Sequence, residues 1–535
     1  MKKSKVLIVI PRYNPTTKIN YSYTFPLGLA YISSALKKAK YNVTCLNLNH
    51  YEGIIQDLMY KILNEKKYDF VCTGNLALGY LITKEIVNSA RNHKSSPRII
   101  LGGSIITSEP ELMFKSLNPD FAVVGEGEKT IVELLDCLEK NKKFDKVKGI
   151  IFAKNNKIIF TEKQELIGNL DSLPLPDFKG FEFEKLLNNT SPYDNDQNSG
   201  FDYPRSYPIM GSRGCPFQCT FCYHSLGYKY RKRSIQNIMK EIKEAVKQYR
   251  INNILFYDDC FSIDPNRVFE FCHHMKKLIA KTPRGIKWGC QLIVNTVNKP
   301  LLTTLKNAGC TTVSFGFESF SPEVLKSMQK PITPQQIDNA YHYTKELKMG
   351  LQANFIFGDI AETKKTAYET LNHWKKNYGG QVRMGFIQPY PGSKIYEHCL
   401  QKGIIKDKLY FINNQMRNTW FNMTNSMSNK EITQLKRDIL LASVKYDKFV
   451  TPLSSKKINH DKYAFKIKCP YCKKVIEYKN FNFNRKYFWF FMVSILCRNC
   501  GMRFNIVSYL RKLICNQHYL KLKLFINSFK KNYNN

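Results

Sequence analysis

Residues 207–222 read YPIMGSRGCPFQCTFC, and this stretch decides how the chain is interpreted. A short apolar run predicts a buried strand, and a turn at Gly214 leads into a loop that holds Cys215, Cys219 and Cys222. Thiolates are strong ligands for iron–sulfur clusters, and three of them leave one iron of a four-iron cluster without a protein ligand. That iron is free to bind a substrate or a cofactor. A zinc loop and three unrelated buried cysteines are the alternatives.

The strand before the cysteine loop begins a strand–helix series that extends from Tyr207 to about Tyr410. Helical patterns, such as those at residues 234–249 and 266–280, separate the strands. Six such units fit a partial parallel barrel, in which chemistry is carried out at the C-terminal ends of the strands. The predicted strands are residues 208–212, 253–257, 286–291, 311–317, 351–357 and 381–387.

The segment before the barrel also alternates apolar runs with helical stretches. Runs at residues 5–11, 41–48, 68–74, 97–103 and 121–125 predict a doubly wound parallel sheet. Ligands of such sheets bind beyond the carboxyl ends of the strands, and glycines end several of these runs. A glycine there lets a flat ligand approach the backbone, or it only makes a tight strand-to-helix turn; the residues alone leave both open.

Two C-x2-C pairs, Cys469 with Cys472 and Cys497 with Cys500, lie near the carboxyl end. Four thiolates in this arrangement satisfy a tetrahedral zinc ion and predict a structural zinc-ribbon-like module. A second iron–sulfur cluster and fortuitous pairs are the alternatives. The aromatic run at residues 487–491 is expected to form the small core of the module, with an exposed surface for a partner or a membrane as the alternative.

The composition favours a folded chain, because 43% of the 535 residues are hydrophobic and 23% are charged. The formal net charge of +39 permits contact with nucleic acid, an anionic membrane surface or an acidic partner. No secretory signal or transmembrane segment is visible, so the 16 cysteines indicate a reducing, cytoplasmic setting with metal chemistry rather than disulfides. Cys260 and Cys399 lack metal spacing and are expected to be small buried residues.

The cysteine loop resembles that of the radical S-adenosylmethionine (SAM) superfamily, whose hallmark is C-x3-C-x2-C with an aromatic residue, here Phe221, before the last cysteine. The resemblance implies a [4Fe–4S] cluster whose open iron chelates the amino and carboxylate groups of SAM. Electron transfer then cleaves SAM to a 5′-deoxyadenosyl radical. The resemblance also implies an electron donor such as flavodoxin or ferredoxin, and a small-molecule or carrier-bound substrate.

Further strings lie where this family places them. Residues 316–319 (GFES) end the fourth predicted strand, and the resemblance implies that Gly316, Glu318 and Ser319 contact SAM there. Capping of the following helix is the alternative role for Glu318. Residues 358–363 (GDIAET) lack the Pro-Gly pair of the corresponding family string, whereas residues 388–393 (QPYPGS) match the cobalamin-associated branch.

In that branch the amino-terminal sheet binds cobalamin. The strings PLGLA at residues 26–30 and VGEGE at residues 124–128 are similar to those of its domain. The resemblance implies that Gly102, Gly103, Gly125 and Glu126 take part in binding the cofactor.

One departure from the cobalamin domain concerns the lower axial ligand of cobalt. Many such domains carry D-x-H-x-x-G after the first strand, but here the loop after Pro11 contains no histidine. His50 follows the second strand instead, and we expect it to be a surface residue rather than a cobalt ligand. A degenerate, empty domain is the alternative to a functional one.

The chain is thus identified as a member of the cobalamin-associated radical SAM branch, with an α/β fold. The expected reaction is cobalamin-dependent C-methylation of an unactivated carbon, in which the deoxyadenosyl radical abstracts hydrogen and methylcobalamin delivers the methyl group. A radical cyclase, oxidase or rearrangement enzyme is the alternative, and a non-catalytic nucleic-acid- or carrier-binding protein is a more distant one. The expected divisions are a cobalamin-binding-like domain (1–140), a connector (141–205), a partial barrel (206–410), a helical extension (411–460), a zinc-ribbon-like module (461–510) and a basic tail (511–535).

Overall fold

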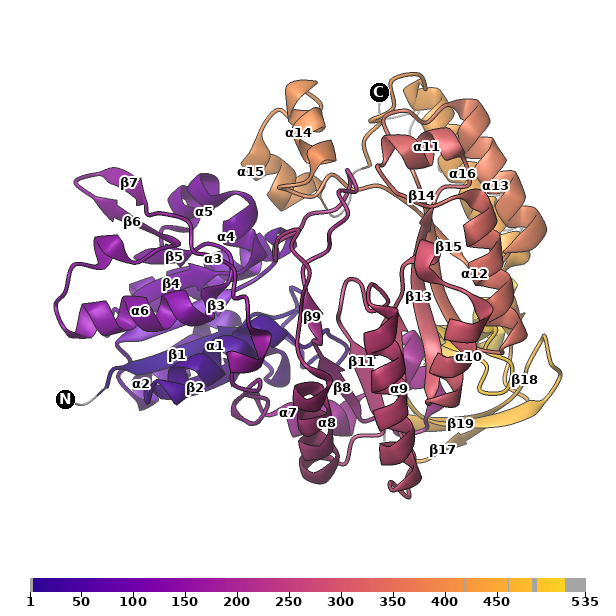
Figure 1. Ribbon diagram of the computed structural model, residues 1–535, viewed down its shortest axis with the longest axis horizontal. Coiled ribbons are helices and arrows are strands. Elements are labelled where there is room, and N and C mark those ends of the chain that lie inside the picture. The colour runs from indigo at the N-terminus through magenta and orange to yellow at the C-terminus, as the bar shows by residue number, and fades with distance from the viewer. Residues whose placement is uncertain (1–2, 417–419, 460, 484–487, 515–535) are drawn as a thin grey trace. The chain divides into compact units, whose positions relative to one another are not determined.

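The computed structural model describes residues 3–416, 420–459, 461–483 and 488–514, which form two compact units (Figure 1). Both units are discontinuous in sequence. The cysteine loop belongs to the same unit as the amino-terminal sheet, although in sequence it lies inside the barrel segment. The first unit consists of Met1–Asn189, Ser212–Glu241 and Gln388–Phe421, and the second of Thr190–Gly211, Ile242–Ile387 and Asn422–Asn535.

A seven-stranded sheet with the order β2-β1-β3-β4-β5-β6-β7 organises the first unit. The strands β1 to β5 pair in parallel, which confirms the predicted sheet, and the strand order reverses between β1 and β3. The β6–β7 hairpin pairs antiparallel with β5, so the sheet continues past residue 140. The strands are β1 (Lys5–Ile10), β2 (Asn42–Asn47), β3 (Phe70–Gly74), β4 (Arg98–Gly102), β5 (Phe121–Val123), β6 (Ile150–Lys154) and β7 (Lys157–Phe160).

Several helices of the first unit bury one stripe of side chains. In α2 the buried residues Ile55, Met59 and Leu63 recur every four positions, which places them on one face of the helix. The central strand β1 is a continuous apolar run instead, and its residues 6–10 are all buried. The helices are α1 (Leu27–Lys38), α2 (Ile55–Glu65), α3 (Tyr80–Asn92), α4 (Ser104–Ser108), α5 (Pro110–Leu117), α6 (Gly127–Glu139), α7 (Phe183–Asn189), α14 (Lys394–Gln401) and α15 (Lys408–Tyr410); α8 (Ile235–Tyr249) runs from the first unit into the second.

A six-stranded parallel sheet organises the second unit. Its strands follow chain order from β8 to β15, and both of these are edge strands, so the sheet is open, as expected of a partial barrel. The helices α9, α10, α12 and α13 lie along its outer side (Figure 1). The strands are β8 (Ser206–Ile209), β11 (Asn253–Phe256), β12 (Lys287–Gln291), β13 (Cys310–Glu318), β14 (Gly350–Phe357) and β15 (Arg383–Phe386).

Side-chain caps fix where several helices of the second unit begin. Thr333, Thr363 and Ser428 each accept a hydrogen bond from a backbone N–H in the first turn of α12, α13 and α16. Among the described residues, no helix has the length and apolar character needed to cross a bilayer. The helices are α9 (Pro265–Ala280), α10 (Lys299–Asn307), α11 (Pro322–Ser327), α12 (Pro334–Glu346), α13 (Lys364–Asn377), α16 (Asn429–Tyr446) and α17 (Tyr509–Ile514).

Short strands in two three-stranded sheets form the carboxyl-terminal module. Within the expected helical extension residues 429–446 form α16, but residues 449–450 and 454–457 form β16 and β17 and pair with the strands of the module. The sheet orders are β16-β21-β20 and β17-β18-β19. The strands are β16 (Phe449–Val450), β17 (Ser454–Lys457), β18 (Lys462–Lys468), β19 (Val475–Asn482), β20 (Met492–Leu496) and β21 (Arg503–Val507).

The core of this module is mainly aromatic, with Phe465, Tyr478 and Phe481 among its buried members. The aromatic run that was expected to form this core is divided. Phe491 is buried, but Trp489 and Phe490 are 63% and 48% exposed. Tyr487 and the tail residues 515–535 lie outside the described residues.

Candidate functional site

The three predicted cluster ligands lie on one loop that a two-residue ladder closes at its base. Ser212–Arg213 (β9) pairs antiparallel with Arg231–Lys232 (β10). β8 ends at Ile209, earlier than the predicted strand, and Ser212 belongs to this ladder instead. Cys219 is buried, and Cys215 and Cys222 are half-buried. The loop therefore holds all three thiols between fixed ends.

The turn into the cysteine loop requires glycine. Gly214 has a φ of +81°, and a Cβ at this position would lie 2.4 Å from the carbonyl oxygen of Lys229. A side chain here would force the two arms of the loop apart. Gly214 thus allows Cys215 to follow directly on the ladder.

Two arginines at the base of the cysteine loop bind the acidic loop that follows β5. Arg213 donates to Glu126 at 2.9 Å and to Glu128 at 2.6 Å. Arg231 donates to both carboxylate oxygens of Glu126, at 2.8 and 2.7 Å. All four side chains are buried. This charge network therefore fixes both ends of the cysteine loop to the C-terminal edge of the amino-terminal sheet.

The ionised state of Glu126 follows from this network. Burial opposes its ionisation, but the hydrogen bonds from Arg231 and the charge of Arg213 together lower its pKa. The Arg213 guanidinium also lies over the ring of Tyr31 on α1, 5.1 Å from its centre. The carboxylate of Glu126 is thus engaged by two guanidinium groups, and a contact between Glu126 and cobalamin stays a prediction.

The segment after β15 supports the cysteine loop from another side. Gly392 in the QPYPGS string has a φ of +86°, and a Cβ there would lie 2.6 Å from two ring carbons of Tyr223. The backbone N–H of Ile395 donates to the carbonyl oxygen of Thr220 at 3.0 Å. Both contacts reach loop residues that adjoin the cysteines. The string that resembles the cobalamin-associated branch therefore packs against the cluster loop.

The predicted SAM contacts lie at the C-terminal end of β13. The strand register shifts between Gly316 and Glu318, and Glu318 has a φ of +60°. Its carboxylate accepts a hydrogen bond from Lys330 at 3.0 Å. A Cβ on Gly316 would lie 2.0 Å from a carboxylate oxygen of Glu318, so a larger residue here would displace the end of this side chain from its observed position. Ser321, not Glu318, caps the following helix.

The roles of Gly316, Glu318 and Ser319 in binding SAM stay predictions. The buried hydroxyl of Ser319 lies 3.3 Å from that of Thr370. This contact places a polar group beside the bulge. The strand end therefore presents a carboxylate and a hydroxyl at one edge of the barrel.

The next strand end holds a buried carboxyl group that sequence analysis did not predict. Glu362 follows β14, is 0% exposed, and accepts a hydrogen bond from the backbone N–H of Gly358 at 2.5 Å. Burial raises the pKa of Glu362 to about 8; the Gly358 hydrogen bond opposes this rise and the nearby Asp359 adds to it. Glu362 is therefore mostly protonated at neutral pH. The GDIAET string contains this glutamate, but the string alone does not show its burial.

The glycines expected to contact cobalamin lie at the C-terminal edge of the first sheet. Gly102 ends β4, where a Cβ would meet only the carbonyl oxygen of Val123 at 3.8 Å. A Cβ at Gly125 would meet nothing within 4 Å. Gly103 differs, because a Cβ there would lie 3.0 Å from the Asn75 carbonyl oxygen, which indicates a tight turn. The bare backbone at Gly102 and Gly125 fits the approach of a flat ring such as a corrin.

His50 is buried, so the expectation of a surface histidine is wrong. Its Nε2 lies 2.9 Å from the Tyr23 hydroxyl and 3.3 Å from the Asn47 side chain. Burial lowers the pKa of His50 to about 4, and the nearby Glu182 carboxylate only partly opposes this effect. Two polar side chains thus engage Nε2, and the expectation that His50 is not a cobalt ligand stays a prediction.

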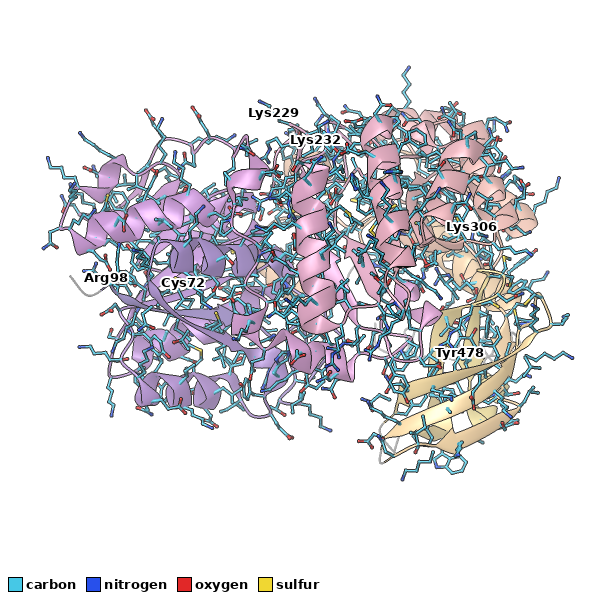
Figure 2. All side chains as sticks on the ribbon, turned by 60° about the horizontal axis from the view of Figure 1, so that its bottom comes forward. Cys72, Arg98, Lys229, Lys232, Lys306 and Tyr478 are labelled. Carbon is cyan, nitrogen blue, oxygen red and sulfur yellow. The ribbon has the colours of Figure 1, made fainter. Side chains whose placement is uncertain are left out.

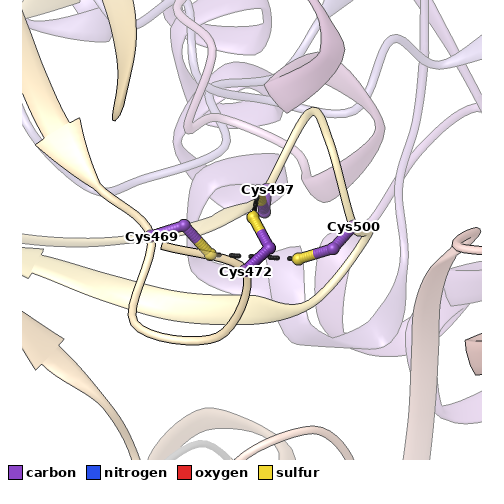
Figure 3. A group of neighbouring side chains, drawn as sticks. All are labelled: Cys469, Cys472, Cys497 and Cys500. Atoms are coloured by element: carbon purple, nitrogen blue, oxygen red, sulfur yellow. Dashed lines mark hydrogen bonds between the residues drawn. The ribbon is translucent and has the colours of Figure 1, made fainter. Parts of the chain in front are cut away.

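The four carboxyl-terminal cysteines gather as predicted (Figure 3). Their sulfur atoms all lie within 4.8 Å of one another, and the Cys469–Cys500 and Cys472–Cys497 sulfur pairs are each 3.8 Å apart. A tetrahedral ion with metal–sulfur bonds of about 2.3 Å spaces its sulfurs by about 3.8 Å. A four-iron cluster takes each thiolate on a different iron, which requires wider spacing. The geometry therefore fits a single metal ion.

Cys260 and Cys399 are both buried, as expected for cysteines with a packing role.

The first unit joins a cysteine loop, suited to an iron–sulfur cluster with one open iron, to a sheet whose C-terminal edge exposes its backbone to a ligand. This combination defines the class of protein. Comparison with known proteins gives the family. The family model described as the radical SAM superfamily matches residues 209–373, and the B12 binding domain model matches residues 20–135. The chain therefore carries a radical SAM domain and a B12 binding domain.

Curated relatives align over most of the chain. An uncharacterized methyltransferase, PH0819, from Pyrococcus horikoshii is 29% identical over 413 residues, which cover 76% of this chain and 85% of the relative. The anaerobic magnesium-protoporphyrin IX monomethyl ester cyclase of Cereibacter sphaeroides is 27% identical and covers 64% of this chain and 55% of its own length.

Solved structures show the same fold. The radical SAM methyltransferase TsrM from Kitasatospora setae, with cobalamin and a [4Fe–4S] cluster bound, superposes with a TM-score of 0.60. The two chains are 14% identical, and the match covers 74% of this chain and 75% of the other. At this identity the likeness establishes the fold alone.

Proposed function

We propose that the chain is a cobalamin-dependent radical SAM methyltransferase that methylates an unactivated carbon. The observation that carries the proposal is the joining of the cysteine loop to the cobalamin-type sheet through Arg213, Glu126 and Arg231 in one compact unit. When bound, the cluster supplies the electron that cleaves SAM to the deoxyadenosyl radical, and methylcobalamin supplies the methyl group.

Named residues of the chain would position these groups. Cys215, Cys219 and Cys222 would hold the cluster, and Gly102 and Gly125 would let the corrin approach the backbone. Glu318 offers an acceptor for the ammonium or ribose groups of SAM.

The reaction class is tested by the products formed from SAM. Full-length protein, reconstituted anaerobically with iron, sulfide and cobalamin, would be incubated with a chemical reductant or a flavodoxin as electron donor. Deoxyadenosine and adenosylhomocysteine together support methylation. Deoxyadenosine alone favours a radical cyclase, oxidase or rearrangement enzyme, and formation of neither product overturns the radical assignment.

Substitution of the cysteines tests which residues hold the cluster. Cys215→Ala, Cys219→Ala and Cys222→Ala should each abolish the brown chromophore and SAM cleavage together, because two thiolates are too few to hold the cluster with its open iron. Cys137→Ala, at a half-buried cysteine without metal spacing, is the matched control and should keep both. Deoxyadenosine formation by a variant that lacks all three cysteines would overturn the assignment.

We further propose that Cys469, Cys472, Cys497 and Cys500 bind a structural zinc ion. Their sulfur spacing supports one tetrahedral ion, and four thiolates leave no open position for a substrate. The ion would hold two turns of a small module whose aromatic core is limited in size.

A further inference from the structure

A cavity of about 310 Å³ lies in the second unit, between the starting ends of three barrel strands and the second cysteine turn. Lys287, Cys310 and Gly350 are the first residues of β12, β13 and β14 and line one wall. Residues 497–499 line another. Chemistry in such barrels is carried out at the opposite ends of the strands, where Glu318 lies, so this cavity is separate from the radical site.

The lining of the cavity holds four cationic side chains against one carboxylate and one thiolate of the proposed zinc site. Lys306 lies on α10 where the barrel helices meet the strands that carry Tyr478 (Figure 2). Asp196 is the single carboxylate among the described lining residues, and Arg503 donates to it at 2.6 Å. The cationic side chains that line the cavity are Lys287, Lys306, Lys348 and Arg498.

Lys287 and Arg498 form a half-buried pair of like charges. The ammonium group of Lys287 donates to the carbonyl oxygen of Gly200 at 3.1 Å. Burial lowers the pKa of Lys287, and the charge of Arg498 lowers it further. Arg498 has a partner in Asp202, at 2.8 Å, but the polar partner of Lys287 is a neutral carbonyl group.

Lys306 and Lys348 form a second pair of like charges nearer the solvent. The ammonium group of Lys306 donates to the carbonyl oxygen of Leu347. Burial lowers the pKa of Lys306, and the charge of Lys348 lowers it further. Among the described residues, no ion pair joins either lysine to a carboxylate. Positive charges held together in this way repel one another, and an anion would relieve that repulsion.

We propose that this cavity binds a diphosphate group of a small molecule. Lysine and arginine are the side chains that bind phosphate oxygens most strongly, and a multivalent anion neutralises several of them at once. A metal cation would be repelled by the same residues, and a neutral ligand would leave the repulsion in place. The volume lies at the lower end of small-molecule pockets, roughly 300–1,000 Å³. The proposal does not depend on the methyl transfer.

Calorimetric titration of full-length, metal-loaded protein with inorganic pyrophosphate, in low-salt buffer free of phosphate, tests the proposal. We expect one saturable site per chain. Lys306→Gln/Lys348→Gln should weaken binding by about tenfold or more, because charge-assisted hydrogen bonds are lost. The variant should keep its metal content. Lys154→Gln/Lys157→Gln removes the same two charges from the exposed ends of the β6–β7 hairpin and should bind as the wild type does.

A nucleoside diphosphate titrated in parallel separates the two sources of the diphosphate group. Tighter binding of the nucleotide assigns the site to a nucleotide ligand, and equal binding assigns it to the diphosphate alone; both results support the site. Equal weakening in the two double variants would show a net-charge effect and overturn the proposal. Binding of a single-stranded oligonucleotide without binding of pyrophosphate would overturn it in favour of a nucleic-acid surface.

Discussion

At the scale of single residues, the buried Glu362 makes the stability of the second unit depend on pH. Its folded-state pKa of about 8 lies above the ordinary value, so the folded protein binds more protons than the unfolded chain between these two pKa values. The free energy of unfolding should therefore fall as pH rises from about 4.5 to about 8, by at most ~1.4 kcal/mol per pH unit.

Glu362→Gln removes this titration while keeping an acceptor for the N–H of Gly358. The variant should gain stability over the wild type as pH rises, as measured by guanidinium unfolding at pH 5.5, 7 and 8.5. Glu323→Gln, at an exposed glutamate on α11, is the control and should show no such trend. An equal pH dependence in Glu362→Gln and the wild type would contradict the buried, protonated state.

The second prediction at this scale concerns the role of Glu318 in binding SAM. Glu318→Gln should assemble the cluster but bind SAM more weakly, by roughly 1.5–3 kcal/mol if a charge-assisted hydrogen bond is lost. Iron analysis and equilibrium binding of SAM measure the two effects separately. If the affinity for SAM were unchanged, the role of Glu318 would be limited to its ion pair with Lys330.

At the scale of elements, the β9–β10 ladder and the loop after β5 act together. Glu126→Ala leaves the buried guanidinium groups of Arg213 and Arg231 without their shared carboxylate, which costs about 3–5 kcal/mol for a buried pair. We expect a lower unfolding temperature and less iron bound per chain after reconstitution, because the base of the cysteine loop loses its anchor.

Two other glutamates serve as controls for the Glu126 variant. Glu128→Ala removes one partner of Arg213 and leaves Glu126 in place, so its effect on iron content should be smaller. Glu133→Ala, in a surface pair with Lys129, should change neither property. Full iron content and an unchanged unfolding temperature in Glu126→Ala would refute the anchoring role.

The sequence predicts helices and strands better than it predicts contacts between residues that are far apart in the chain. The apolar runs locate β1 to β5 and the six barrel strands because burial on both faces requires continuous apolar residues. The two-residue strands β9 and β10 are too short to leave a pattern. Glu126 resembles a cofactor contact in sequence, and its arginine partners lie more than 80 residues away along the chain. The aromatic run likewise has no periodicity that separates the buried Phe491 from the exposed Trp489.

At the scale of the whole molecule, the two proposed metal sites belong to different compact units. The cysteine triplet lies in the first unit and the four-cysteine group in the second. Within the second unit the carboxyl-terminal module is tied to the barrel by Arg503, which donates to Asp196 at 2.6 Å and to the carbonyl oxygen of Leu351 at 2.8 Å. Loss of one metal should therefore leave the other in place.

The separation of the sites gives a prediction for Cys469→Ser/Cys472→Ser. Metal analysis of the wild type should find about one zinc ion per chain in addition to the iron, because four thiolates form a closed site. The double variant should lose the zinc and keep the iron of the cluster. Its module should become sensitive to limited proteolysis, since metal binding supplies roughly 10–16 kcal/mol in small zinc domains.

Cys137→Ser is the matched control and should keep both metals and the protease resistance of the wild type. Iron in place of zinc at the four cysteines would overturn the zinc assignment but keep a single-ion site. Loss of the cluster iron in Cys469→Ser/Cys472→Ser would contradict the independence of the two sites. An unchanged protease pattern after loss of zinc would show instead that the aromatic core and Arg503 hold the module without an ion, because those contacts do not involve the cysteines.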